Sequence, residues 1–221
     1  MNLQLASARN VVGECDGLQC KINQGFDRQV KRLGARLAVS AYDLDPHLKE
    51  RIRDFKFFVA EKDEIGTASD ASGNIVVYRG LYQPGLDEGV LAFAIAREMG
   101  RVMARHHDEN SAASLVASVL VRLLLPVTNL ASGAALLAST AASAAGAKAI
   151  AADGTPEKTR EATSIAIDLL AAEGWRIGEV GDALLDYSDR LPAGDWRRSI
   201  EESRLSFKAM DAKRALLALD P

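Results

Sequence analysis

Apolar side chains recur at three- and four-residue steps through the first part of the chain. Between residues 22 and 42 the recurring positions are Phe26, Val30, Leu33, Leu37 and Val39. This spacing gathers them on one face and predicts an amphipathic helix. The turn residues that end at Pro46 close this helix, and a short helix through Ile52 should follow. Residues 1–20 show no periodicity and are expected to form an N-terminal arm.

The pattern then changes to short β-forming runs separated by turn residues. Phe55 to Ala60 is one such run, and the stretches 65–68 and 74–78 flank the turn-rich sequence Ser-Asp-Ala-Ser-Gly. This arrangement predicts a strand followed by a β-hairpin. We therefore expect a small antiparallel sheet.

A strongly apolar helix should come next, capped by Asp87 and running to about His107. Its apolar residues include Val90, Leu91, Phe93, Ala94, Ile95 and Val102. These are too many for a surface helix, so we expect this helix to be central and largely buried.

Three further helices are expected in the C-terminal third. The first covers about 157–173 and ends at Gly174, a residue type favoured just past a helix end. The other two should cover about 177–191 and 196–219. Together these patterns predict an α+β fold that is mostly helical, with a single domain over residues 21–221.

Residues 111–152 form a segment rich in Ala, Ser, Gly and Leu, with no charged side chain between Arg122 and Lys148. Its length suits a membrane span, but Pro126, Asn129 and several serines interrupt it. We expect a buried helical hairpin or an exposed apolar lid instead. An exposed lid would meet a protein partner, another copy of the chain or a membrane surface.

The net charge and the cysteines set only weak limits on the class of partner. The 221-residue chain has a net charge of −3 and a pI near 5.7, which argues against nucleic acid as the main partner. Cys15 and Cys20 lie close together, and either a disulfide or two free thiols fits this spacing. Residues 1–15 lack the basic and apolar regions of a secretory signal.

The sequence Arg-Glu-Met-Gly-Arg at 97–101 matches a zinc-peptidase helix in which both histidines are arginines. In His-Glu-x-x-His, two imidazoles one turn apart bind zinc and the Glu acts as general base. A guanidinium stays protonated and offers donors only, so neither arginine can bind zinc. We therefore expect neither a metal nor another cofactor.

The order of these motifs resembles a known enzyme family. A strand at 75–81 precedes the helix at 91–107, and a small-residue apolar segment separates that helix from the sequence at 160–175. This order is similar to that of the zinc metallopeptidase family of HtpX, BepA and the CaaX prenyl proteases. The resemblance covers roughly residues 25–215. It implies a minimal gluzincin-type domain, with a small antiparallel sheet and two former active-site helices.

Carried over residue by residue, the resemblance places Arg97 and Arg101 at the two zinc-histidine positions. Glu98 matches the catalytic glutamate, which is vestigial without a metal-bound water to act on. Thr159 falls at the third zinc ligand, a Glu in the family, and Arg198 at a later histidine. All three ligands are thus absent. Zinc belongs only to the alternative of an active enzyme with unconventional ligands.

Two interpretations of these charged residues stay open. Glu98 is a surviving base or, as we favour, an ion-pair partner of Arg101 or Arg97. The arginines form an anion or peptide-carboxylate site together with Arg198, or a buried salt-bridge network. The network is favoured, and its carboxylates would come from Glu98, Glu161 or Asp168.

The strand at 75–78 matches the strand that, in the family, pairs with an extended substrate. If its edge is open, a peptide can bind beside Ile75 and Val77 by strand addition without being cleaved. The alternative is an edge covered by the domain itself.

These observations favour a pseudopeptidase, a metallopeptidase-like protein without catalytic activity that binds a peptide or protein partner. The resemblance implies proteolysis and envelope quality control as the setting, with a periplasmic or cell-envelope location. Two alternatives stay open. One is an active zinc metalloendopeptidase, and the other is an assembly or membrane-surface protein that acts through residues 112–152.

Overall fold

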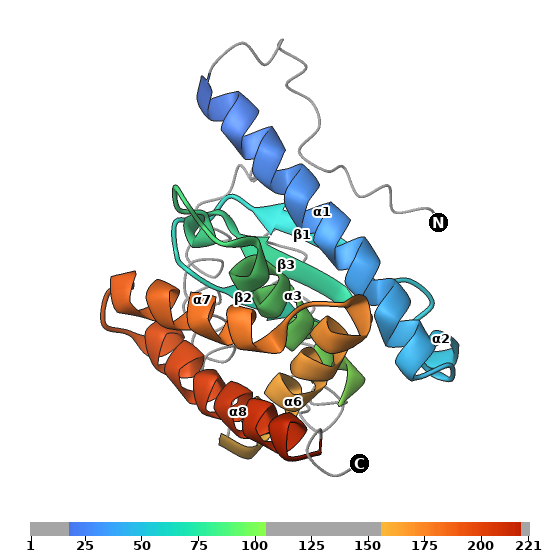
Figure 1. Ribbon diagram of the computed structural model, residues 1–221. Helices are drawn as coiled ribbons and strands as arrows, with labels where there is room; N and C mark the ends of the chain where they lie inside the picture. The colour runs from blue at the N-terminus through green and yellow to red at the C-terminus, as the bar shows by residue number, and fades with distance from the viewer. Residues whose placement is uncertain (1–17, 105–155, 218–221) are drawn as a thin grey trace, which may run out of the picture.

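The computed structural model describes residues 18–104 and 156–217, which form a mostly helical fold with one small sheet (Figure 1). The elements in chain order are α1 (Leu18–Leu44), α2 (Leu48–Arg51), β1 (Lys56–Ala60), β2 (Thr67–Ser69), β3 (Asn74–Tyr78), the 3₁₀ helix η1 (Arg79–Leu81), α3 (Glu88–Met103), α6 (Pro156–Glu173), α7 (Ile177–Arg190) and α8 (Asp195–Leu217). The predicted α+β class with mostly helical content is confirmed.

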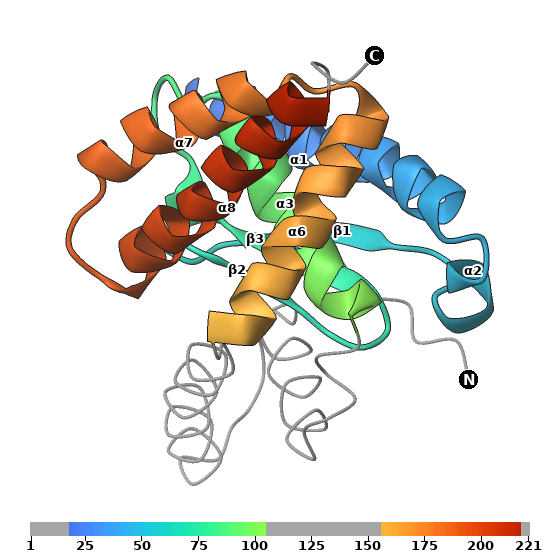
Figure 2. The same ribbon diagram turned by 60° about the horizontal axis from the view of Figure 1, so that its bottom comes forward.

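The central element is α3, which packs against α1, α6, α7 and the sheet (Figure 2). Side chains on all of its faces are buried, as the apolar sequence predicted. Asp87 caps its first turn, because one carboxylate oxygen accepts a hydrogen bond from the N–H of Gly89 at 2.7 Å. The helix ends at Met103, four residues before the predicted end near His107.

The three strands form a mixed sheet in the order β1-β3-β2. The predicted hairpin is confirmed, since β2 pairs antiparallel with β3 and Thr67 lies opposite Val77. The purely antiparallel sheet is wrong, because β1 pairs parallel with β3, with Lys56 opposite Asn74. The chain leaves β1, runs down the far edge as β2 and returns between them as β3. A pattern of β-forming runs carries no information on strand direction.

The peptide-binding edge expected at Ile75 and Val77 is also wrong. Their strand β3 lies in the middle of the sheet and has a partner on each side. Both side chains are fully buried in the main core beneath the helices. Val76 and Tyr78 point to the opposite face and belong to a second buried cluster. The edges of this sheet are β1 and β2.

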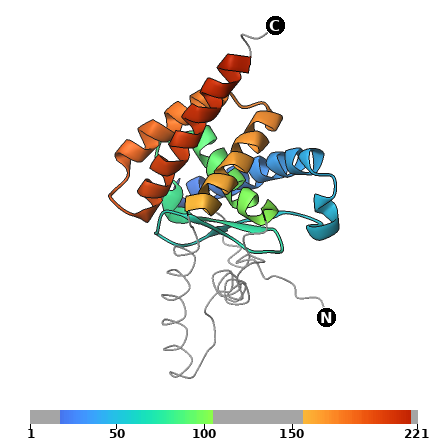
Figure 3. The same ribbon diagram turned by 90° about the horizontal axis from the view of Figure 1, so that it is seen from below.

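The long helices lie on one side of the sheet, so the protein has a helical layer above a thin layer of strands (Figure 3). One continuous core joins the two layers and contains side chains from α1, β3, α3, α6, α7 and α8. The predicted helices in the C-terminal third are confirmed, and Gly174 ends α6 with a φ of +97°.

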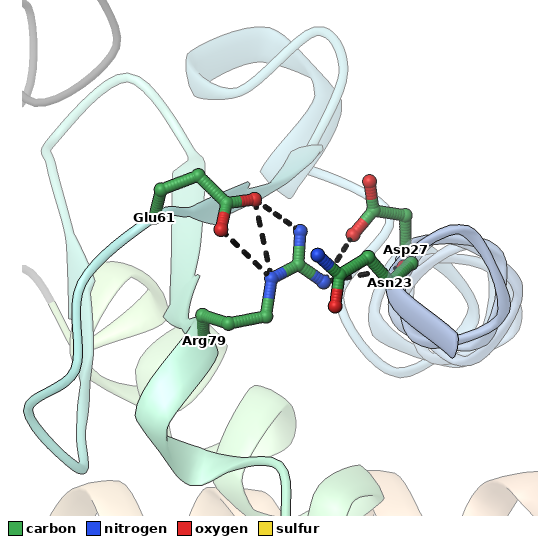
Figure 4. Close-up of polar contacts among 4 residues, drawn as sticks. All are labelled: Asn23, Asp27, Glu61 and Arg79. Atoms are coloured by element: carbon green, nitrogen blue, oxygen red, sulfur yellow. Dashed lines mark hydrogen bonds and ion pairs between the residues drawn. The ribbon is translucent and has the colours of Figure 1, made fainter. Parts of the chain in front are cut away.

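Arg79 ties α1 to the loops at one end of the sheet (Figure 4). Its guanidinium donates to Asp27 at 2.7 Å and to the main-chain oxygen of Asn23 at 3.2 Å, both on α1. It also bonds both oxygens of Glu61, which follows β1. Burial alone lowers the pKa of Arg79, but the two carboxylates outweigh it and raise the pKa. These contacts of Arg79 hold α1 against the end of the sheet.

Several sequence predictions fall on residues outside the described part of the chain. They concern the apolar segment 111–152, most of the arm at 1–20 and the pairing of Cys15 with Cys20. The last three residues of the predicted arm, 18–20, belong to α1. None of the helices in residues 18–104 and 156–217 is both long enough and apolar enough to cross a membrane.

The closest approach of α3 to α6 requires glycine at position 100. A Cβ atom added there would lie 2.5 Å from the main-chain oxygen of Ala162. We predict that Gly100→Ala lowers the free energy of unfolding by about 2 kcal/mol, since backbone must move to relieve the overlap. Chemical denaturation of the purified variant measures this change.

Gly181→Ala is the matched control within another helix, α7. A Cβ atom there would lie 3.5 Å from the side chain of Phe207, an ordinary contact. Alanine favours helix by about 1 kcal/mol over glycine, so this variant should be as stable as the parent or more stable. Equal stability of the two variants would show that the α3–α6 crossing does not depend on Gly100.

Candidate functional site

A pocket of about 400 Å³ opens beside the Arg-Glu-x-x-Arg sequence of α3. The loop that leads into β2 forms one wall, and the α7–α8 loop with the first turn of α8 forms the other. The lining residues are Lys62, Glu64, Ile65, Gly66, Thr67, Tyr78, Arg97, Glu98, Arg101, Leu191, Pro192, Ala193, Gly194, Asp195, Trp196, Arg197 and Ser199. The structure therefore brings Arg97, Glu98 and Arg101 to one pocket, as their helical spacing predicted.

Glu98 lies at the inner end of this pocket with 1% of its surface exposed. Its two carboxylate oxygens accept one hydrogen bond each, from the hydroxyl of Thr67 and the hydroxyl of Ser69, both at 2.8 Å. These residues alternate along β2, so both side chains point to the same face of the sheet and meet α3. Arg101 adds an ion pair at 3.4 Å.

This environment determines the charge of Glu98. Burial by itself raises the pKa of the carboxyl group, but the charges of Arg101 and Arg97 and the hydroxyls of Thr67 and Ser69 outweigh it. The net pKa of Glu98 lies below its ordinary value, so the group is ionised at neutral pH. A carboxylate with this low pKa and both oxygens engaged is a poor general base. The favoured interpretation of Glu98 as an ion-pair partner of Arg101 is confirmed.

Arg97 is buried to the same extent, with 1% of its surface exposed, yet no carboxylate pairs with it among the described residues. Its Nη1 donates to the hydroxyl of Ser199 at 2.8 Å, and its buried Nε has no acceptor. The guanidinium lies between two rings, 4.7 Å from Trp196 and 5.6 Å from Phe93. The predicted salt-bridge network is thus wrong for Arg97, because Glu98 forms its ion pair with Arg101 and no other carboxylate of the described residues pairs with Arg97.

The unpaired charge changes the titration of Arg97. Burial and the nearby Arg101 lower the pKa of Arg97 to about 10, although Glu98 and Glu202 act in the opposite direction. Arg97 is still charged at neutral pH, but its charge is less favourable in the fold than in water. Tyr78, on the pocket wall, shows the same dry environment, since burial followed by Glu98 and Glu64 raises its pKa to about 12.

The anion-site interpretation placed Arg198 beside Arg97, and this placement is wrong. Its side chain is 70% exposed and pairs with Asp195 on the surface of α8. The next residue, Ser199, faces α3 instead and bonds Arg97. Adjacent helical residues point about 100° apart, so an alignment error of one residue moves a side chain from the pocket to solvent.

Thr159, which the resemblance placed at the third zinc ligand, is buried on α6 but does not line the pocket. Its main-chain oxygen accepts a hydrogen bond from Thr163 at 2.7 Å. The hydroxyl of Thr163 lies 3.2 Å from that of Ser203 on α8. Hydroxyl groups thus fill the space between α6 and α8, and Thr159 contributes nothing to the site of Arg97.

The residues at the site do not suit a zinc ion. Arginine offers only donors, and the carboxylate of Glu98 already accepts three partners. Within residues 18–104 and 156–217, no group of three His, Cys, Asp or Glu side chains comes together to hold a metal.

Sequence reasoning missed four residues of the site. Thr67 stood in the predicted strand at 65–68, but Ser69 was assigned to the predicted turn, so no signal in the sequence indicated that both face one way along β2. Trp196 and Ser199 lie about a hundred residues from Arg97 along the chain and approach it only through tertiary packing.

No protein-family model matches the chain, and a search of curated proteins finds no relative.

Replacing Glu98 tests its structural role. We predict that Glu98→Gln lowers the free energy of unfolding by about 3 kcal/mol at neutral pH, because Arg101 loses its ion-pair partner and the buried Arg97 loses a nearby negative charge. The difference from the parent should shrink at acidic pH. Because the fold lowers this pKa below 4.5, its contribution is present above that value and is lost as the pH falls through the folded pKa.

The control is Glu88→Gln in the same helix. Glu88 pairs with Arg32 at 2.5 Å, but both side chains are exposed. An exposed pair contributes about 0.5 kcal/mol, so this change should be small. Denaturant titrations from neutral to acidic pH measure both variants, and a pH-independent loss in Glu98→Gln would contradict the ion-pair assignment.

Replacing Arg97 should have the opposite effect on stability. We predict that Arg97→Met raises the free energy of unfolding by about 1–2 kcal/mol, since methionine fills similar space without a buried, unpaired charge. Arg198→Met, at an exposed position, should stay within about 0.5 kcal/mol of the parent. Thermal and denaturant unfolding measure both. A destabilised Arg97→Met protein would mean that the contacts with Ser199 and the rings outweigh the charge.

Proposed function

We propose that this protein is a catalytically inactive, metallopeptidase-like protein that binds a peptide or protein partner in the pocket beside α3. The observation that carries the proposal is the state of Glu98. Its carboxylate is held by Thr67, Ser69 and Arg101, and arginines stand where the resemblance places the zinc histidines. A peptidase base needs a metal-bound water to deprotonate, and these residues offer no place for one.

The pocket has features that suit a peptide. Its wall includes Gly66 and Thr67, at the outer edge of the sheet. Tyr78 donates its N–H to the oxygen of Gly66 at 3.0 Å, and Asp70 donates to the oxygen of Asn74 at 3.1 Å. In an antiparallel pair these bonds alternate, so the main-chain groups of Thr67 face away from β3. An extended peptide would pair there by strand addition.

The resemblance extends the proposal to its setting. A gluzincin-type ancestry implies a role beside proteolysis in cell-envelope quality control, with a periplasmic or envelope location. In that setting a binding domain without hydrolytic activity would hold partners instead of cleaving them. Binding in the pocket, and not the location, is the part that the described contacts support.

Metal content and peptidase activity test the loss of catalysis. We predict no stoichiometric zinc, by elemental analysis, in protein purified without chelator or a metal-binding tag. Hydrolysis of a fluorogenic peptide mixture with added zinc should stay at the level of buffer, in the parent and in Glu98→Gln alike. Bound zinc together with an activity that Glu98→Gln removes would instead support the alternative of an active metalloendopeptidase.

A further inference from the structure

We propose that the pocket recognises the C-terminal carboxylate of its peptide ligand through the guanidinium of Arg97. This inference rests on the proposed peptide-binding function and names the part of the peptide that the site reads. Three properties of the described residues support it, namely the charge balance of the pocket, the orientation of Arg97 and the shape of the walls.

The charge balance leaves Arg97 as the one unpaired ion among the charged residues that line the pocket and belong to the described ranges. Each of the others has an opposite charge within 4 Å. The pairs are Lys62 with Glu64, Arg101 with Glu98, Arg197 with Glu201 and Asp195 with Arg198. An uncompensated buried guanidinium costs several kcal/mol, so an anion beside Arg97 would relieve a penalty built into the free protein.

The guanidinium is already oriented for a carboxylate. Ser199 holds Nη1, and the rings of Trp196 and Phe93 limit rotation of the group. The opposite edge, formed by Nε and Nη2, has no hydrogen bond to the described residues. Two parallel N–H donors on one edge match the two oxygens of a carboxylate. Because Arg97 is held in place, binding would order little additional side chain.

The charge near Arg97 favours a monoanion. The adjacent residue on α3 is Glu98, whose ionised carboxylate forms its ion pair with Arg101. One further negative charge neutralises Arg97 and completes the balance. A phosphate dianion would add a second negative charge beside Glu98, with no cation left among the described lining residues to offset it.

The walls suit the end of a peptide with an apolar last residue. The pocket volume of about 400 Å³ lies within the range of small-ligand sites. Apolar surface comes from Ile65, Leu191, Pro192 and the ring of Trp196. The main-chain groups of Thr67, on the buried edge strand β2, face away from β3, and we assign the preceding peptide unit to them. The pocket thus has a matching surface for the carboxylate, the side chain and the backbone of the last residue of the peptide.

The test compares two short peptide pools that differ only at the C-terminus. Each pool is labelled with a fluorophore at its N-terminus, randomised at the inner positions and ends in Leu, as the free acid or as the amide. In fluorescence polarisation with the parent protein, the amide pool should bind at least about tenfold more weakly than the acid pool. This is the loss expected when a charge-assisted hydrogen bond is removed. This comparison needs no variant and so does not depend on mutant folding.

Variants at position 97 then test whether Arg97 is the residue that recognises the carboxylate. Arg97→Met should bind the acid pool as weakly as the amide pool, and Arg97→Lys should recover only part of the difference, since a single ammonium lacks the two-donor edge. Arg176→Met is the matched control. It removes an exposed arginine that pairs with Glu179 outside the pocket, and it should retain the full preference.

Each contrary outcome overturns a different claim. Equal binding of the acid and amide pools by the parent would overturn carboxylate recognition and leave peptide binding intact. Binding of neither pool would overturn the proposed function itself. If N-acetyl-leucine competes as well as the acid pool, the site takes small carboxylates and the assignment to a peptide terminus is wrong.

Discussion

Burial of α3 on every side is the constraint on which the rest of this structure depends. A charge on the buried part of such a helix is costly unless a group inside the protein balances it, because water cannot reach it. The carboxylate of Glu98 meets this requirement through Thr67, Ser69 and Arg101. The same contacts join α3 to the edge strand β2, which places a sheet edge beside the pocket. Local charge compensation therefore also sets the geometry of the candidate site.

The ion pair between Glu98 and Arg101, at 3.4 Å, leaves Arg97 without a carboxylate partner among the described residues. Arg97 is left with a hydroxyl and two aromatic rings, which orient the group but do not balance its charge. A buried, oriented and unpaired cation lowers the stability of the free protein. Such a group is easier to understand as part of a binding site than as a stabilising contact.

The topology of the sheet alters how a peptide would approach this site. With β3 in the centre, Ile75 and Val77 are core residues beneath the helices, and the strand next to the pocket is β2. Gly100 allows α3 to lie directly on α6, and Gly34 leaves space for the ring of Phe57 where α1 crosses β1. The charged motif, the edge strand and the α7–α8 loop thus converge because the helices pack closely around α3.

The sequence by itself determined the helices, the hairpin, the Asp87 cap, the burial of α3 and the absence of zinc ligands at 97 and 101. Periodicity, capping and ligand chemistry depend on residues close together in the chain, so a local pattern is sufficient for each. Only the tertiary structure decided the parallel pairing of β1 with β3, the exposure of Arg198 and the approach of Trp196 and Ser199 to Arg97. Strand order and long-range contacts follow from how the whole chain packs, and a shift of one residue on a helix changes which side chain reaches the pocket.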